Sequence, residues 1–245
     1  MKYTLDTIPV WDAYKKKPPC PFCLLQSDYE TAAVESLLAS YMEPDCRIET
    51  NKKGFCKHHS ELLYQSHNRL GLALMMETHF LALSEELELI KKEKPHFQNP
   101  FKLKKKSSLS DQVQAMSSRC FLCDQLDAAM RRYAYTAARL FFDQEEFRTV
   151  FNQSNGVCLK HLGLLLDVSY ESLSQEEFSL FSQELLEVTI SDLKKLQHDL
   201  HLFTLQFDYR FHNINAPKEA IEQALQKRNG SDPFTPSFPS NTEDD

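Results

Sequence analysis

A cysteine pattern that occurs twice is the feature that most constrains this chain. Each copy has a CxxC motif followed after 32 or 34 residues by a CxxH motif. The two CxxC motifs are 100 positions apart and the two CxxH motifs 102, so the chain has the regularity of a tandem duplication. The motif residues of the first copy are Cys20, Cys23, Cys56 and His59, and those of the second are Cys120, Cys123, Cys158 and His161.

Three cysteines and one histidine are a typical ligand set for structural zinc, which takes four tetrahedral sulfur and nitrogen ligands. A CxxC lets a tight turn aim two thiolates at one ion, and a CxxH on a helix places residues i and i+3 on one face. Gly54 and Gly156 stand two positions before the third cysteine of each copy, where such a turn can require a positive φ. We therefore expect two Zn2+ ions per chain, one Cys3His site in each copy.

The chain has other histidines and one further cysteine that are possible ligands. His58 competes with His59, but the second copy has Lys160 at the matching position, which favours His59. Cys46 has no counterpart in the second copy and is expected to be a small buried apolar residue. His79 stands beside an apolar stripe and is expected to be structural.

His198 and His201 share a helical face and could bind a metal, although a solvated pair is the more ordinary interpretation. An arginine recurs at matching places in both copies, as Arg47 and Arg148.

Helical periodicity dominates the segments between the motifs. Apolar residues recur every four positions from Leu25 to Tyr41 and again from Ala129 to Phe141, which predicts an amphipathic helix after each CxxC. A further helix is expected to begin at each CxxH, followed by long helices near 68–94 and 175–207. Residues 3–14 are expected to form an extended or short helical lead-in.

The composition supports an all-α fold. Only 5 of 245 residues are glycine, whereas an all-β chain needs frequent turn glycines. We expect a first zinc-bearing helical module over 1–94, a linker over 95–111, a second module over 112–228 and a disordered tail over 229–245. The linker contains a run of lysines broken by prolines, and the tail is rich in proline and acidic residues.

Net charge and hydropathy indicate which kinds of partner and which cellular compartment to expect. The net charge of −7 disfavours nucleic acid, because duplex binding depends on neutralising phosphates. No apolar stretch resembles a signal peptide or a membrane span. We expect a cytoplasmic protein with no membrane attachment, in which seven cysteines serve as ligands or thiols rather than as a disulfide framework.

Several segments resemble a known family. They are the opening from Tyr3 to Val10, the first CxxC, the stretch from Met42 to Cys56, and Asn68 to Leu72. Together they resemble an uncharacterised bacterial family known only as a domain of unknown function, over roughly residues 3–210. The resemblance implies a bacterial protein with paired cysteine motifs and implies no activity.

Two classes of function fit these features of the sequence. The first is a non-catalytic, zinc-stabilised helical scaffold that engages an unidentified protein partner. An enzyme is disfavoured because a Cys3His set leaves no coordination position for water or substrate, and the chain has no phosphate loop, nucleophile elbow or HExxH motif. The alternative is a thiol-based redox or zinc-release switch that uses the CxxC pairs.

Overall fold

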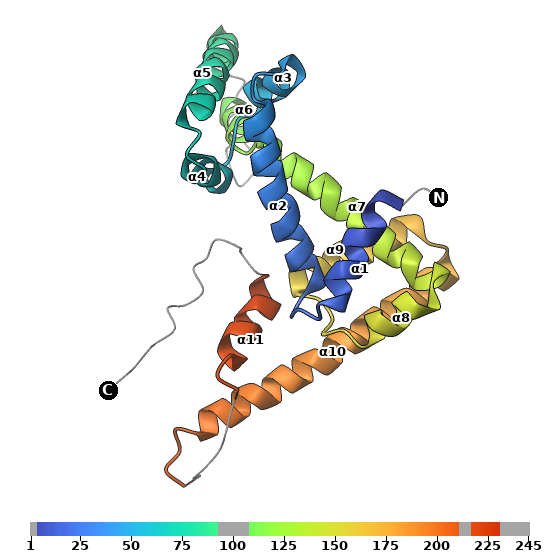
Figure 1. Cartoon of the computed structure of the whole chain (residues 1–245). Coiled ribbons are helices and arrows are strands. Elements are labelled where there is room, and N and C mark those ends of the chain that lie inside the picture. The colour runs from blue at the N-terminus through green and yellow to red at the C-terminus, as the bar shows by residue number, and fades with distance from the viewer. Residues whose placement is uncertain (1–3, 93–107, 211–216, 231–245) are drawn as a thin grey trace, which may run out of the picture. The chain divides into compact units, whose positions relative to one another are not determined.

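The computed structural model describes residues 4–92, 108–210 and 217–230, and all regular structure in these ranges is α-helical (Figure 1). This confirms the all-α prediction. In chain order the helices are α1 (Thr4–Lys15), α2 (Pro21–Ser40), α3 (Pro44–Lys53), α4 (Lys57–Gln65), α5 (Arg69–Lys92), α6 (Ser108–Ser117), α7 (Phe121–Asp143), α8 (Glu145–Asn152), α9 (Leu159–Ser172), α10 (Gln175–Leu205) and α11 (Ala220–Asn229).

The helices expected from periodicity are present. α2 and α7 begin directly after Cys20 and Cys120, and α4 and α9 begin directly after Cys56 and Cys158. The lead-in is a regular helix, α1, with Pro9 inside it. The short helices α3 and α8, which complete the segment between CxxC and CxxH in each copy, and the helix α11 were not expected.

The chain divides into two compact units. The outer unit consists of residues 1–28 and 128–245, and the inner unit consists of residues 29–127, so the inner unit is an insertion in the sequence of the outer one. The unit boundaries fall inside α2 and α7. Each unit therefore combines parts of both sequence copies.

Aromatic packing forms the core of the outer unit. Tyr14 of α1 lies with its ring centroid 5.1 Å from that of Phe147 on α8, and Phe141 of α7 lies 5.2 Å from Phe181 on α10. α9, α10 and α11 pack against one another. The largest fully buried aromatic side chains of this unit are Tyr14, Phe22, Phe141, Phe147, Phe151 and Phe181.

The inner unit has a smaller and largely aliphatic core. α3 packs on α5, and α4 also contacts α5. The buried cluster consists of Val34, Leu37, Leu62, Leu63, Met75, Cys120 and Leu122. Cys46 packs at its edge as a partly buried side chain.

Two expected segments fall mostly outside the described residues. Of the linker 95–111, residues 95–107 lie outside them, while 108–111 form the first turn of α6. Of the tail 229–245, Asn229 ends α11, Gly230 caps it, and residues 231–245 lie outside the description. Among the described residues, no helix is both long and apolar enough to cross a lipid bilayer.

Candidate metal centres

The eight motif residues converge into two quartets, but each quartet draws on both sequence copies. The outer site consists of Cys20, Cys23, Cys158 and His161, and the inner site consists of Cys56, His59, Cys120 and Cys123. Within each quartet one ligand atom from every residue lies within 4.8 Å of the others. The expected grouping, in which each CxxC shares an ion with the CxxH of its own copy, is therefore wrong.

The lengths of the helices explain the crossed grouping. α2 has 20 residues and extends for about 30 Å, whereas α3, which follows it, has 10 residues and extends for only about 15 Å. The chain that leaves Cys23 therefore does not return to it by Cys56. The second copy has the same imbalance, with 23 residues in α7 and 8 in α8.

All four half-sites lie at helix amino termini. Cys56 and Cys158 are the N-cap residues of α4 and α9, with extended backbone angles. The carbonyls of Cys20 and Cys120 accept the first helical hydrogen bonds of α2 and α7, from Leu24 and Asp124. The unpaired N–H groups and the positive end of the helix dipole stabilise negative sulfur there.

Gly54 and Gly156 make the turn into each CxxH possible. Their φ angles are 62° and 63°, in the left-handed region that favours glycine. Each also touches a helix of its own unit. A Cβ on Gly54 would lie 2.4 Å from His79 Nε2, and a Cβ on Gly156 would lie 2.8 Å from the Cα of Thr189.

In each quartet the histidine points its Nδ1 atom at the sulfurs. In the inner site His59 Nδ1 lies 3.3 Å from the sulfurs of Cys56, Cys120 and Cys123. In the outer site His161 Nδ1 lies 3.2 Å from Cys158 Sγ and 3.5 Å from each of the other two sulfurs. The inner quartet contains His59 and not His58.

The protonation of the inner quartet follows from these contacts. Burial alone would lower the pKa of His59, but its contacts with Cys120 and Glu30 outweigh burial and raise the pKa to about 10. Burial opposes ionisation of Cys120, yet the contact with His59 brings its pKa down to about 6. The inner quartet thus favours a thiolate beside an imidazolium, and a metal ion would have to displace protons to bind there.

The Nε2 atoms of the two histidines have different partners. His161 Nε2 lies 3.1 Å from Oε1 of Gln26, a neutral amide. His59 Nε2 lies 2.9 Å from Oε1 of Glu30, a carboxylate that is only 3% exposed. With Nδ1 on a metal, each Nε2–H donates to these oxygens and fixes the ring orientation. The sequence pattern indicated neither residue.

The two half-sites of the inner site are joined directly. The backbone N–H of Phe121 donates to the carbonyl of Gly54 at 3.0 Å, which links the CxxC loop to the CxxH turn. Lys53 and Asp124 add an ion pair at 2.9 Å. In the outer site the position that matches Phe121 is Pro21, which has no N–H to donate.

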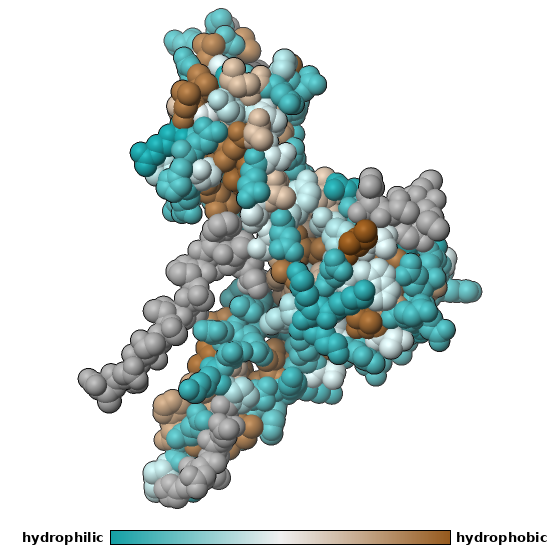
Figure 2. Space-filling model, in the orientation of Figure 1, coloured by the Kyte–Doolittle hydropathy of each residue, from teal (hydrophilic) through white to brown (hydrophobic). Residues whose placement is uncertain are grey.

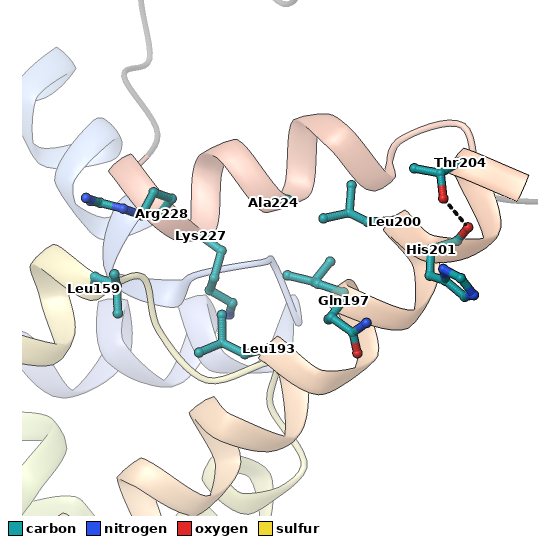
Figure 3. A pocket seen from close by; sticks show the side chains of 10 residues that line it. Leu159, Leu193, Gln197, Leu200, His201, Thr204, Ala224, Lys227 and Arg228 are labelled. Atoms are coloured by element: carbon teal, nitrogen blue, oxygen red, sulfur yellow. Dashed lines mark hydrogen bonds between the residues drawn. The ribbon is translucent and has the colours of Figure 1, made fainter. Parts of the chain in front are cut away.

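A buried lysine joins the two half-sites of the outer site. Lys227 extends from α11 toward α10 (Figure 3) and is 2% exposed. Its Nζ donates to the carbonyl of Pro19 at 2.8 Å and to that of Asn155, so it links the segments that lead into Cys20 and into the second CxxH. It also forms an ion pair with Asp192 at 2.7 Å.

The residue that caps α11 lies close to two sulfurs of the outer site. A Cβ on Gly230, at the end of α11, would lie 3.8 Å from Cys158 Sγ and 3.9 Å from Cys23 Sγ. All four outer ligands are buried, whereas Cys56 and Cys123 of the inner site are only partly buried. The inner site is therefore the more accessible of the two.

The remaining candidates do not join a quartet. His79 Nδ1 lies 2.8 Å from the carbonyl of Asn51. His201 lines an apolar groove of about 450 Å3 between α10 and α11 (Figure 3), where brown side chains gather in Figure 2. Among the described residues, His198 and His201 belong to no group of three or more metal-ligating side chains.

Comparison with known proteins gives a family and no function. No curated protein matches the chain, and no solved structure matches it. A family model described as "Family of unknown function (DUF6062)" matches residues 1–235. With nearly its whole length matched, the chain belongs to this family of unknown function.

Proposed function

We propose that the protein is a non-catalytic helical scaffold in which two structural Zn2+ ions hold the outer and inner units in their folded form. The observation that carries the proposal is the convergence of two complete Cys3His quartets at helix amino termini. Four protein ligands fill a tetrahedral site, and such a site has no position left for substrate. The donor chemistry of the described residues fits Zn2+, which prefers sulfur and imidazole ligands.

The metal content of the purified protein tests this proposal. We expect two equivalents of zinc per chain by plasma mass spectrometry, and one equivalent when a single quartet is broken. The matched control is Cys46→Ser, which removes a cysteine outside both quartets and should leave two equivalents. A wild-type protein that folds fully without metal would contradict the proposal.

The scaffold role includes a protein partner in the cytoplasm. Seven cysteines without a disulfide suit a reducing compartment, and a net charge of −7 does not suit nucleic acid. α5 supports a binding role, because Leu70, Leu81 and Leu89 are each at least 60% exposed on it. Cross-linking in cells, compared between wild type and a Leu70→Glu, Leu81→Glu variant, tests whether this helix contacts another protein.

A second candidate, zinc release on oxidation, is favoured by one feature of the inner site. Cys56 Sγ and Cys123 Sγ lie 3.7 Å apart, and both cysteines are partly exposed. Hydrogen peroxide oxidises these two thiolates to a disulfide; its O–O bond breaks, its two oxygens leave as hydroxide that takes up two protons from solvent to become water, and the ion leaves the site. If mild peroxide releases one zinc per chain and reductant restores binding, the switch gains support over the scaffold.

A further inference from the structure

A second set of donor atoms lies on the far side of the His59 ring from the inner sulfurs. Oε1 of Glu30 lies 2.9 Å from His59 Nε2 and 3.0 Å from His58 Nε2. The three ligand atoms all lie within 4.8 Å of one another. Metal–ligand bonds of about 2.0–2.2 Å place neighbouring ligand atoms roughly 3.0–3.5 Å apart, so the two distances to Glu30 Oε1 suit donors that share a cation.

The Glu30 carboxylate is incompletely satisfied. It is 3% exposed, and both imidazoles approach the same oxygen, Oε1. Its other oxygen, Oε2, is buried and has no hydrogen-bond partner among the described residues. A buried carboxylate oxygen without a partner is costly, and a cation held by both oxygens would remove that cost.

The site is open to solvent on one side. The His58 side chain is 36% exposed, whereas the sulfurs of the inner site lie across the ring of His59. A cation can therefore reach Glu30 and His58 without passing the first ion. Three protein donors leave at least one position for water, which makes such an ion exchangeable.

We propose that Glu30, His58 and His59 form a third metal site, adjacent to the inner zinc, for an exchangeable divalent ion of the Co2+ to Zn2+ type. The two-nitrogen, one-carboxylate donor set selects this class of ion over Mg2+ and Ca2+, which prefer all-oxygen sites. His59 lies between the two ions, with Nδ1 on zinc and Nε2 on the third ion, and its Nε2 proton passes to solvent. The inference rests on the proposed zinc in the inner site.

The outer site supplies an internal control. Lys160 occupies the position that matches His58, and its Nζ donates to Oε1 of Gln26 at 3.2 Å. His161 Nε2 lies on the same amide oxygen. A lysine and a neutral amide do not form a cation site, so we assign a third ion to the inner unit alone.

Cobalt titration of the two-zinc protein tests the proposal. We expect one added equivalent of Co2+ with weak visible bands and without the near-ultraviolet sulfur-to-cobalt bands that would show exchange into a quartet. His58→Lys, which copies the second sequence repeat, should weaken this binding at least tenfold and keep two zinc ions, and Glu30→Gln should weaken it as well. The double variant Gln26→Glu, Lys160→His should gain a further equivalent at the outer site.

Each result of the titration supports or overturns the third metal site. Equal cobalt binding by wild type and His58→Lys, or none by wild type, overturns the third site while the two zinc ions stand. Sulfur-to-cobalt bands overturn it as well, because the added ion then occupies a quartet. A wild-type protein that lacks the two zinc ions overturns the proposed function instead, and zinc analysis before the titration separates these failures.

Discussion

The outer and inner sites use the same four ligand types on the same local structures, yet they are held in different ways. The inner half-sites are joined by a direct backbone hydrogen bond from Phe121 to Gly54, beside a small aliphatic core. The outer half-sites are joined by Lys227, beside a core of six buried aromatic side chains. The two sequence copies thus share the ligands and the turn glycines, while the contacts that join the half-sites differ between the two units.

The largest expected effect comes from breaking one quartet at a time. Structural zinc contributes about 10–16 kcal/mol of apparent binding energy, and a fully buried aromatic or aliphatic side chain contributes about 1.5–3 kcal/mol. The outer ligands Cys23 and Cys158 are 135 positions apart and the inner ligands Cys56 and Cys123 are 67 apart. This doubling of the closed segment changes the free energy of loop closure by only about 0.6 kcal/mol. The size of the core therefore decides how much each unit is destabilised when its quartet is broken.

We therefore expect Cys123→Ser to unfold the inner unit, and Cys158→Ser to destabilise the outer unit while its aromatic core stays packed. Both variants should retain one zinc ion. Hydrogen exchange resolved by segment checks this, with residues 29–92 losing protection in Cys123→Ser alone. Equal protection of both units in the two variants would refute the comparison.

Removal of the lysine support should affect the outer site alone. Lys227→Met leaves the Asp192 carboxylate, 11% exposed, without its cation, and breaking one partner of a buried pair costs about 3–5 kcal/mol. It also removes the link between Pro19 and Asn155. We expect a chelator to remove the outer zinc faster, and the inner zinc at the wild-type rate.

Two further variants separate the two roles of Lys227, which are to join the outer half-sites and to neutralise Asp192. Lys227→Met with Asp192→Leu removes the stranded carboxylate, so it should regain stability but not the slow release of the outer zinc. Lys195→Met, on the exposed side of α10, should change neither measurement. If Lys227→Met releases both ions at the wild-type rate, the lysine does not support the outer site.

The turn glycines should respond unequally to the same substitution. An alanine at either position adopts an unfavourable φ, which costs roughly 1 kcal/mol. At Gly156 the new methyl group also meets the backbone of Thr189, whereas at Gly54 it meets the side chain of His79. We expect losses in the free energy of unfolding of about 3 kcal/mol for Gly156→Ala and about 2 kcal/mol for Gly54→Ala.

Chemical denaturation of the zinc-loaded variants measures these losses. Adding His79→Ala to Gly54→Ala should recover part of the loss, because the ring then no longer occupies the space. If Gly54→Ala loses more free energy of unfolding than Gly156→Ala, the contact with the Thr189 backbone does not determine the cost of a methyl group at Gly156.

The smallest effect concerns the repeated arginines. Arg148 pairs with Glu184 on α10, whereas Arg47 donates to the hydroxyl of Thr78 at 2.7 Å. The hydrogen bond from Arg148 lowers the pKa of Glu184 below its usual 4.5. The stabilisation that the ionised Glu184 gives the folded state is therefore complete above pH 4.5. It is lost as the pH falls through the lower pKa that Glu184 has in the folded protein.

Glu184→Gln should lower the stability of the outer unit by about 1 kcal/mol at neutral pH, since the pair is partly exposed. Denaturation of wild type and variant from pH 3 to pH 7 measures the difference, which should shrink below pH 4.5. Thr78→Val in the inner unit serves as the comparison, and its effect should not vary with pH over this range. A pH-independent effect of Glu184→Gln would exclude the ion pair as its cause.

Much of the fold could be predicted from the sequence, because helix periodicity and ligand spacing are local signals. The apolar repeat from Leu25 to Tyr41 predicted α2, and the CxxH motif predicted the start of α4. The comparison of His58 with Lys160 favoured His59, and His59 is the histidine that lies with the three inner cysteines.

The grouping of the ligands was wrong because motif spacing was treated as proximity. The predicted helix from Leu25 to Tyr41 already spans about 25 Å, which is long enough to separate Cys23 from Cys56. Lys227, Glu30 and Gln26 were missed for a different reason. Their roles depend on tertiary contacts that no repeat or spacing in the sequence encodes.

Because the inner unit is inserted in the sequence of the outer one, the two sites become complete in a fixed order during synthesis. The inner quartet is complete once residue 123 has emerged, whereas Cys20 and Cys23 have no histidine partner until residue 161 follows. At about 5–20 residues per second, the first two cysteines wait several seconds or longer as nascent-chain thiols. Lys227 emerges later still. The residues of the inner site are therefore all available before those of the outer site, and the lysine that joins the outer half-sites comes last.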